Sequence, residues 1–138
     1  MSKFVDEESV SFDDVLIIPQ YSNIVSRSDV SLRRKYGIGE MSLDIPIISA
    51  NMDTVTGYHM AETMNHLGGL GVIHRYMSEE ESVDTVNVWR SSHEDPIFMS
   101  VGCLEKDRRR IDMLLETSDQ LGLCVDIAHG DSKNMVLT

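Results

Sequence analysis

Four short apolar runs alternate with helix-forming stretches, and this alternation limits the chain to few folds. The runs occupy residues 45–48, 70–73, 96–101 and 123–125. They are short and mostly aliphatic, which is typical of strands buried on both faces of a parallel sheet. Strands that alternate with amphipathic helices imply right-handed crossovers. The sequence therefore predicts an α/β fold with a parallel sheet.

The stretches between the runs have helical periodicity and recognisable ends. Apolar or small residues recur at helical spacing in three sets: Met60, Ala61, Met64 and Leu67; Val83, Val86 and Trp89; and Ile111, Leu114, Leu115, Ser118 and Leu121. Gly68 and Gly69 predict a left-handed end for the first helix. Ser78 with Glu81 predicts a capping box that opens the second. Gly122 is expected to cap the third, and residues 131–138 to begin a fourth.

The segment before the first run is less regular. Residues 15–18 form an apolar run stopped by Pro19 and predict a further short strand. Residues 22–34 alternate loosely, and we expect an extended segment or a short hairpin over the sheet. Gly37 and Gly39 predict a turn. We expect residues 1–138 to form a single domain.

Composition excludes several functional classes. The net charge of −11 argues against nonspecific binding to nucleic acid or an anionic membrane. The chain has no apolar run long enough to span a bilayer, and acidic residues stand where a signal peptide would be basic. A cytoplasmic location is the default expectation. Cys103 and Cys124 lie in or beside apolar runs, as free buried thiols do.

Each predicted strand ends in small, polar or ionisable residues, and this is the main functional signal. These endings are residues 49–53, 74–75, 100–102 and 126–130. Parallel strands place such endings at one edge of a sheet, where ligands bind in α/β folds. Asp126 could accept two hydrogen bonds from a ribose diol.

Other candidates have simpler interpretations. Residues 68–71 could form a phosphate loop, but they precede a strand, which favours a helix cap. His74 and His129 could bind a metal, yet no carboxylate or thiol stands at ligand spacing. Cys103 could be a nucleophile, but no base is paired with it, which favours a packed side chain. Residues 107–110 are most simply a solvated helix face.

Six segments together resemble the IMP dehydrogenase/GMP reductase family. In order they are SFDDVLIIPQYS, SRSDV, IPIISANMDTV, GVIHRYMS, MSVG and VDIAHGDS, and the resemblance runs from Phe12 to Thr138. It implies a TIM (β/α)8-type barrel, of which this chain would hold the first four β/α units, a half barrel with an extended lead-in. It also implies an oxidoreductase acting on a purine nucleotide.

The resemblance leans towards GMP reductase, which converts GMP to IMP and ammonia with NADPH. Asn51 stands where dehydrogenases usually have Pro or Ala. Residues 78–95 run to the third strand without the regulatory insertion that dehydrogenases usually carry there. IMP dehydrogenase, which oxidises IMP to XMP with NAD, is the alternative. A catalytically inactive half barrel that binds a full-length relative is a second alternative.

The resemblance also implies roles for particular residues. Those expected to contact the dinucleotide are Ser26, Arg27, Arg75, Asp126, Ile127 and Ala128, the first two reaching a neighbouring subunit's cofactor in a homo-oligomer. Those expected to line the nucleotide pocket are Ala50, Asn51 and Met52. Arg75 departs from the pattern, because reductases often have Lys there, and the two cations bind phosphate with different geometry.

The family's catalytic cysteine loop and monovalent-cation site have no counterpart here. Both follow the fourth strand, and neither Cys103 nor Cys124 occupies the nucleophile position. A full barrel needs roughly 250 residues. The expectation is a truncated or split amino-terminal half that requires a complementing carboxyl-terminal half for activity.

Overall fold

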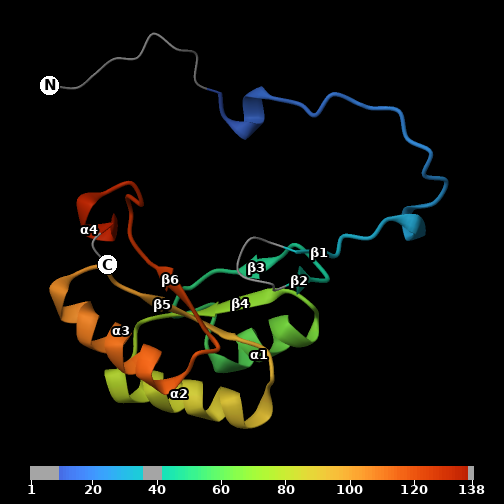
Figure 1. Ribbon diagram of the computed structural model, residues 1–138. Coiled ribbons are helices and arrows are strands. Elements are labelled where there is room, and N and C mark those ends of the chain that lie inside the picture. Colours follow the sequence, from blue (N-terminus) through green and yellow to red (C-terminus); the bar gives the residue numbers. More distant parts are fainter. Residues whose placement is uncertain (1–9, 36–41, 137–138) are drawn as a thin grey trace, which may run out of the picture. The chain divides into compact units, whose positions relative to one another are not determined.

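The computed structural model describes residues 10–35 and 42–136. The chain divides into two compact units, with the boundary in the sequence between Ser31 and Leu32. The described part of the first unit holds two single-turn 3-10 helices, η1 (Phe12–Asp14) and η2 (Arg27–Asp29), joined by extended chain (Figure 1). The strand predicted at 15–18 is wrong. Leu16 and Ile17 are 95% exposed, and within the described ranges no strand pairs with them to form a ladder.

A short hairpin was one of two predictions for residues 22–34, but the strand pairing forms later in the sequence. Residues 22–33 are extended apart from η2, and pairing begins only with β1 (Arg34–Lys35), which lies antiparallel to β2 (Ser42–Leu43). The turn predicted at Gly37 and Gly39 lies outside the described residues.

The second unit is built on a four-stranded parallel sheet. Its strands are β3 (Ile48–Ser49), β4 (Leu70–Ile73), β5 (Ile97–Val101) and β6 (Leu121–Val125), and they lie side by side in chain order. Ile48 pairs with Leu70, Val72 with Phe98, and Ile97 with Leu121 in the register. The parallel sheet predicted from the alternating runs is confirmed.

The helices connecting the strands are α1 (Tyr58–His66), α2 (Glu79–Ser92) and α3 (Glu105–Thr117), and α4 (Lys133–Val136) follows the sheet. Figure 1 shows α1, α2 and α3 together on one side of the sheet. Doubly wound folds place helices on both sides, whereas consecutive strands with all helices on one side are the arrangement of a β/α barrel. The predicted half-barrel fold is confirmed. No described helix has the length and apolar character needed to span a membrane.

The sheet carries a separate apolar cluster on each face. The larger cluster joins the strands to the helices and contains Ala61, Ile73, Val86, Trp89, Ile97, Met99, Val101 and Leu114. The smaller cluster contains Leu43, Leu70, Val72 and Phe98. Successive strand residues alternate between the two faces, so Val72 joins one cluster and Ile73 the other. Burying each large side chain contributes about 1.5–3 kcal/mol.

Two glycines allow close packing against the sheet. A Cβ added at Gly71 in β4 would lie 2.4 Å from the Ala61 Cα of α1. A Cβ added at Gly122 would lie 2.2 Å from the Phe98 ring. Gly122 lies within β6, so its predicted role as a helix cap is wrong. Helix α3 ends at Thr117, and Ser118 is its C-cap.

The first predicted strand also differs from expectation. Only Ile48 and Ser49 form β3, and Ile47 and Ile48 are each 55% exposed. Because β3 is the edge strand, it has a partner on one side only in this sheet.

The predicted helix ends at Gly68 and Ser78 are confirmed. Gly68 has a φ of 78°, the left-handed conformation that favours glycine. The Ser78 hydroxyl accepts from the Glu81 amide at 3.1 Å, and the Glu81 carboxylate accepts from the Ser78 amide at 2.7 Å. Both bonds satisfy amides that the first turn of α2 cannot pair internally.

Replacing Ser78 with alanine is expected to destabilise the second unit by about 1 kcal/mol, because the Glu81 amide loses its acceptor. Urea denaturation of the wild-type and variant chains measures the difference. Ser91→Ala is the matched control, since the Ser91 hydroxyl only bonds the Val88 carbonyl of its own helix. Equal losses in both variants would show that the cap contributes nothing specific.

Candidate functional site

The carboxyl ends of the four strands lie at one edge of the sheet, as predicted. The clearest contact there joins residues that follow two different strands. The Nε of Arg75, after β4, donates to the Oδ2 of Asp126, after β6, at 2.9 Å. The two are 51 residues apart in the sequence, and β5 lies between their strands. The structure thus brings together two of the residues that were predicted to contact the dinucleotide.

The Arg75–Asp126 pair is positioned and accessible. The side chains are 29% and 33% exposed, so a ligand can reach both. The hydrogen bond that Arg75 donates to Asp126 raises the pKa of Arg75, which keeps the guanidinium charged. A guanidinium has five N–H donors and a carboxylate about four acceptor sites, so one shared bond leaves capacity for further partners. A cation beside a carboxylate suits a ligand that carries both phosphate and hydroxyl groups.

Hydrogen bonds to the backbone fix both partners. The amide of Asp126 donates to the carbonyl of Val101 at 2.8 Å, which continues the β5–β6 ladder. The buried Ser100 hydroxyl donates to the Ile73 carbonyl at 3.0 Å, next to the start of the loop that carries Arg75. These two hydrogen bonds link the carboxyl ends of β4, β5 and β6, next to the Arg75–Asp126 pair.

Arg110 is a residue that the sequence interpretation placed wrongly. It was expected on a solvated helix face with residues 107–109, but it is half-buried and donates to the carbonyls of Arg75 and Met77 at 2.6 and 2.5 Å. It reaches the neighbouring loop because α3 packs beside α2. A run of charges along a helix gives no signal of which member faces a neighbouring element.

A second network fixes the loop after β3. Thr56 is completely buried, and its hydroxyl lies 2.5 Å from the Ala50 carbonyl and 2.9 Å from the Ser49 hydroxyl. The Thr56 carbonyl accepts from the His74 amide at 3.1 Å, which ties this loop to the end of β4. Sequence reasoning missed Thr56, because a threonine between a strand and a helix is common.

The network presents the predicted pocket residues at the sheet edge. The amide of Met52 donates to the Ala50 carbonyl at 2.9 Å, forming a tight turn around Asn51. The Met52 side chain is 53% exposed, although methionine is usually buried. The structure thus places an accessible apolar side chain on a fixed turn. The assignment of Ala50, Asn51 and Met52 to a nucleotide pocket stays a prediction.

The remaining dinucleotide candidates are less informative. Ser26 and Arg27 belong to the first unit, where the Ser26 hydroxyl accepts from the Ser28 amide at 3.3 Å and caps η2. Ile127 is half-buried and Ala128 is exposed, directly after β6. Their contacts with a dinucleotide stay predictions.

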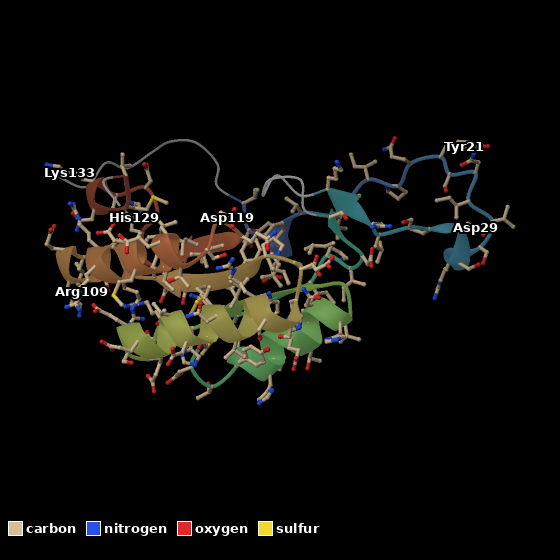
Figure 2. The ribbon with its side chains drawn as sticks, turned by 60° about the horizontal axis from the view of Figure 1, so that its bottom comes forward. Tyr21, Asp29, Arg109, Asp119, His129 and Lys133 are labelled. Atoms are coloured by element: carbon tan, nitrogen blue, oxygen red, sulfur yellow. The ribbon has the colours of Figure 1, made fainter. Side chains whose placement is uncertain are left out.

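The alternative sites are not supported by the geometry. The Nδ1 of His74 accepts from the Tyr76 amide at 3.1 Å. Figure 2 shows His129 in the exposed segment after β6, with Asp119 before that strand. Among the residues that the structure describes, no three metal-ligating side chains gather. Burial, and secondly the charge of Asp126, raise the pKa of the Cys124 thiol, which disfavours the nucleophilic thiolate.

Several hollows open on the described part of the chain, and two of them lie near the ends of the sheet strands. One of about 300 Å³ adjoins the candidate site and is lined by Arg75, Glu79, Lys106, Asp107 and Arg110. Another of about 240 Å³ lies near the amino-terminal ends of β4 and β5, where Gly69, Leu70 and Pro96 contribute to its wall. The first is the better candidate for a ligand, since it lies at the edge where parallel α/β sheets bind their ligands.

Comparisons with known proteins agree with the architecture and with the motifs. A family model described as IMP dehydrogenase / GMP reductase domain matches residues 9–138. An inosine-5'-monophosphate dehydrogenase from Nitrosopumilus maritimus is 45% identical over 80 residues, which are 58% of this chain and 17% of that protein. A GMP reductase from Vibrio vulnificus is 32% identical over 134 residues, which are 94% of this chain and 38% of that protein.

The structural comparison leads to the same group. The crystal structure of inosine 5' monophosphate dehydrogenase from Legionella pneumophila superposes with a TM-score of 0.75 at 35% identity. The match covers 93% of this chain and 38% of that one. The chain therefore spans less than two fifths of the length of these relatives.

Proposed function

Because the chain belongs to the IMP dehydrogenase/GMP reductase family, we propose that it forms the amino-terminal part of a barrel that oxidises or reduces a purine nucleotide with NAD(P). We further propose that the reaction is the NADPH-dependent conversion of GMP to IMP and ammonia. The observation that carries the proposal is the Arg75–Asp126 pair at the carboxyl-terminal edge of the sheet. It combines a phosphate-binding cation with a diol-binding carboxylate in one accessible place.

The residues of this chain have distinct roles in the proposal. Asp126 accepts hydrogen bonds from the ribose hydroxyls of the dinucleotide, and Arg75 donates to a phosphate oxygen. Ile127 and Ala128 continue this surface after β6. When bound, NADPH supplies the hydride. The chain's own contribution is binding and orientation.

The turn after β3 receives the other ligand in this proposal. Asn51 offers both amide donors and a carbonyl acceptor to a purine edge. Met52 provides an apolar, adaptable surface for the base. Ala50, held by Thr56, keeps the turn narrow. GMP and IMP differ at purine C2, and groups from the rest of the barrel complete the pocket there.

The direct connection from β4 to β5 favours the reductase. Helix α2 alone joins the two strands. Coverage of the chain does not separate the two enzymes, because the Vibrio vulnificus reductase matches 94% of it at 32% identity and the Legionella pneumophila dehydrogenase matches 93% at 35%. The alternative, an IMP dehydrogenase that uses NAD, is favoured by the higher identity of 45% to the Nitrosopumilus maritimus protein over a shorter stretch. The two reactions share the fold and differ in substrate and cofactor.

The remaining half of the barrel is the partner that the proposal requires. Ile48 of the edge strand β3 and Ile47 just before it are 55% exposed each, and further elements of a barrel would cover this surface. The family's cysteine loop and monovalent-cation site would come from that half. Ser26 and Arg27 would reach a dinucleotide bound by a neighbouring copy in a homo-oligomer.

In the deciding experiment, this chain is co-expressed with a second chain. The second chain is the segment of the Vibrio vulnificus reductase that follows the part matched by this chain. The purified complex is supplied with GMP and NADPH, and NADPH oxidation is followed. The expected result is GMP-dependent oxidation with release of IMP. The matched complex contains the corresponding segment of the Nitrosopumilus maritimus dehydrogenase and is supplied with IMP and NAD. Turnover by this second complex and not by the first identifies the chain as part of a dehydrogenase instead.

A folded complex that turns over neither pair of substrates contradicts the enzymatic proposal. The remaining candidate is then a half barrel that binds a full-length relative. The apolar side chains of the first unit favour association, since Phe12 and Tyr21 are 98% and 95% exposed. Capture of the intact Vibrio vulnificus reductase by the chain, without turnover by the reconstituted complex, would support this second candidate.

A further inference from the structure

The guanidinium of Arg110 joins helix α3 to the loop that follows β4. Its Nη1 donates to the Arg75 carbonyl at 2.6 Å, and its Nη2 donates to the Met77 carbonyl at 2.5 Å. A planar fork of donors fits two carbonyls that lie two residues apart, whereas a lysine ammonium is a point donor. Arg110 therefore fixes the backbone on both sides of Tyr76.

The loop fixed by Arg110 carries the cation of the candidate site. From this loop the Arg75 side chain extends to Asp126, and its guanidinium carbon lies 5.2 Å from the centroid of the Tyr76 ring. The backbone of Arg75 is thus held from α3, and its side chain is held from the segment after β6. Contacts therefore hold both the backbone and the side chain of Arg75 in place.

The neighbouring arginines of α3 have a different role. Arg108 pairs with Glu105 and Arg109 with Glu79, and the two arginine side chains are 54% and 74% exposed. Exposed ion pairs contribute little to stability, because water and salt screen them. Arg110 is half-buried and contacts carbonyl oxygens of another β/α unit. Its two hydrogen bonds hold the loop that follows β4 in place.

We propose that Arg110 is a positioning residue for dinucleotide recognition. It holds the loop so that Arg75 meets Asp126, and together these two present a cation and a carboxylate to phosphate and ribose groups. Arg110 acts through Arg75, because its guanidinium bonds the backbone carbonyls of the loop that carries Arg75. The inference rests on the proposed function, because that function makes Arg75 and Asp126 the dinucleotide-binding pair.

The binding test uses the full chain and NADPH, whose fluorescence reports binding. Arg110→Ala is expected to raise the Kd for NADPH about tenfold, the size of losing one charge-assisted positioning contact. Arg110→Lys restores only part of the affinity, because one amine cannot bridge both carbonyls. Arg109→Ala removes the same charge from the same helix and is the matched control, with an expected change below about twofold.

A double variant separates positioning from general loss of structure. If Arg110 acts through Arg75, then Arg75→Ala combined with Arg110→Ala binds NADPH no more weakly than Arg75→Ala alone. Additive losses would overturn the proposal, because they would mean that Arg110 acts independently of Arg75. An Arg110→Ala variant that binds NADPH as the wild type does would overturn it as well.

A second measurement needs no ligand. The Nε–H of Arg75 donates to Asp126, so its exchange with water, followed by NMR, is slowed in the wild type. Arg110→Ala is expected to speed this exchange, whereas Arg109→Ala leaves it unchanged. If neither the wild-type chain nor its complex with the remaining half of the barrel binds NADPH, the dinucleotide part of the proposed function fails, and this exchange measurement alone decides the positioning role. Unchanged exchange in Arg110→Ala overturns the inference.

Discussion

Replacing Gly71 with valine is expected to prevent the second unit from folding. A Cβ at this position would lie 2.4 Å from the Cα and 2.8 Å from the Cβ of Ala61. The Cα belongs to the backbone of α1, so a side-chain rotation cannot relieve the overlap. Relief requires α1 to move away from β4 and to open the larger apolar cluster. Overpacking of this kind costs about 3 kcal/mol or more, a large part of the stability of a small domain.

The fluorescence of Trp89 measures this effect directly. Trp89 is the only tryptophan in the chain, and it is 3% exposed and stacked on His93 with ring centroids 4.1 Å apart. Unfolding exposes the ring and shifts its emission to longer wavelength. Gly130→Ala is the matched control, since a Cβ there meets nothing within 4 Å. A Gly71→Val chain with native emission and unchanged urea midpoint would contradict the close packing of α1 on β4.

Replacing Asp126 with asparagine is expected to weaken NADPH binding about ten- to hundredfold, which corresponds to about 1.5–3 kcal/mol for hydrogen bonds to a charged group. The amide keeps the size of the side chain but removes the charge. It therefore loses one ribose acceptor and the electrostatic attraction that holds Arg75. Titration of the chain with NADPH measures the change. The unfolding midpoint is expected to change little, because Asp126 is 33% exposed and not part of either apolar cluster.

Asp119→Asn is the matched control for this prediction. Asp119 is an exposed aspartate just before β6, whereas Asp126 follows that strand, so the two variants change net charge equally at opposite ends (Figure 2). Equal weakening by both variants would show that the effect comes from the overall charge of the chain. Only a loss confined to Asp126→Asn supports a ribose contact at the site.

The sequence predicts the regular part of the second unit well, because its signals there are local. Helical periodicity located α1, α2 and α3, and the capping signals at Gly68 and Ser78 correctly marked an end and a start. Gly122 shows where local signals fail. A glycine after a helical pattern reads as a cap, but here it makes room for the Phe98 ring from the adjacent strand. That requirement comes from a residue 24 positions earlier in the chain.

In the candidate site, too, the sequence predicted the features with local signals and missed those that depend on distant residues. The positions of Arg75 and Asp126 at strand ends were predicted, since parallel strands place their ends together. Their direct contact was not predicted, and neither were Thr56 and Arg110. Both of the latter act through hydrogen bonds to backbone carbonyls. A carbonyl is present at every position, so the sequence carries no mark of which one a distant side chain will choose.

The contacts around the loop after β4 also define where this fold can be divided. Arg110 and Asp126 both reach back to Arg75, from the helix after β5 and from the segment after β6. A chain break or recombination point between residues 75 and 126 would make these contacts depend on how well two separate pieces reassemble. A segment exchanged between relatives must therefore include all of residues 75–126 to keep the contacts of Arg75 with Arg110 and Asp126 within one piece.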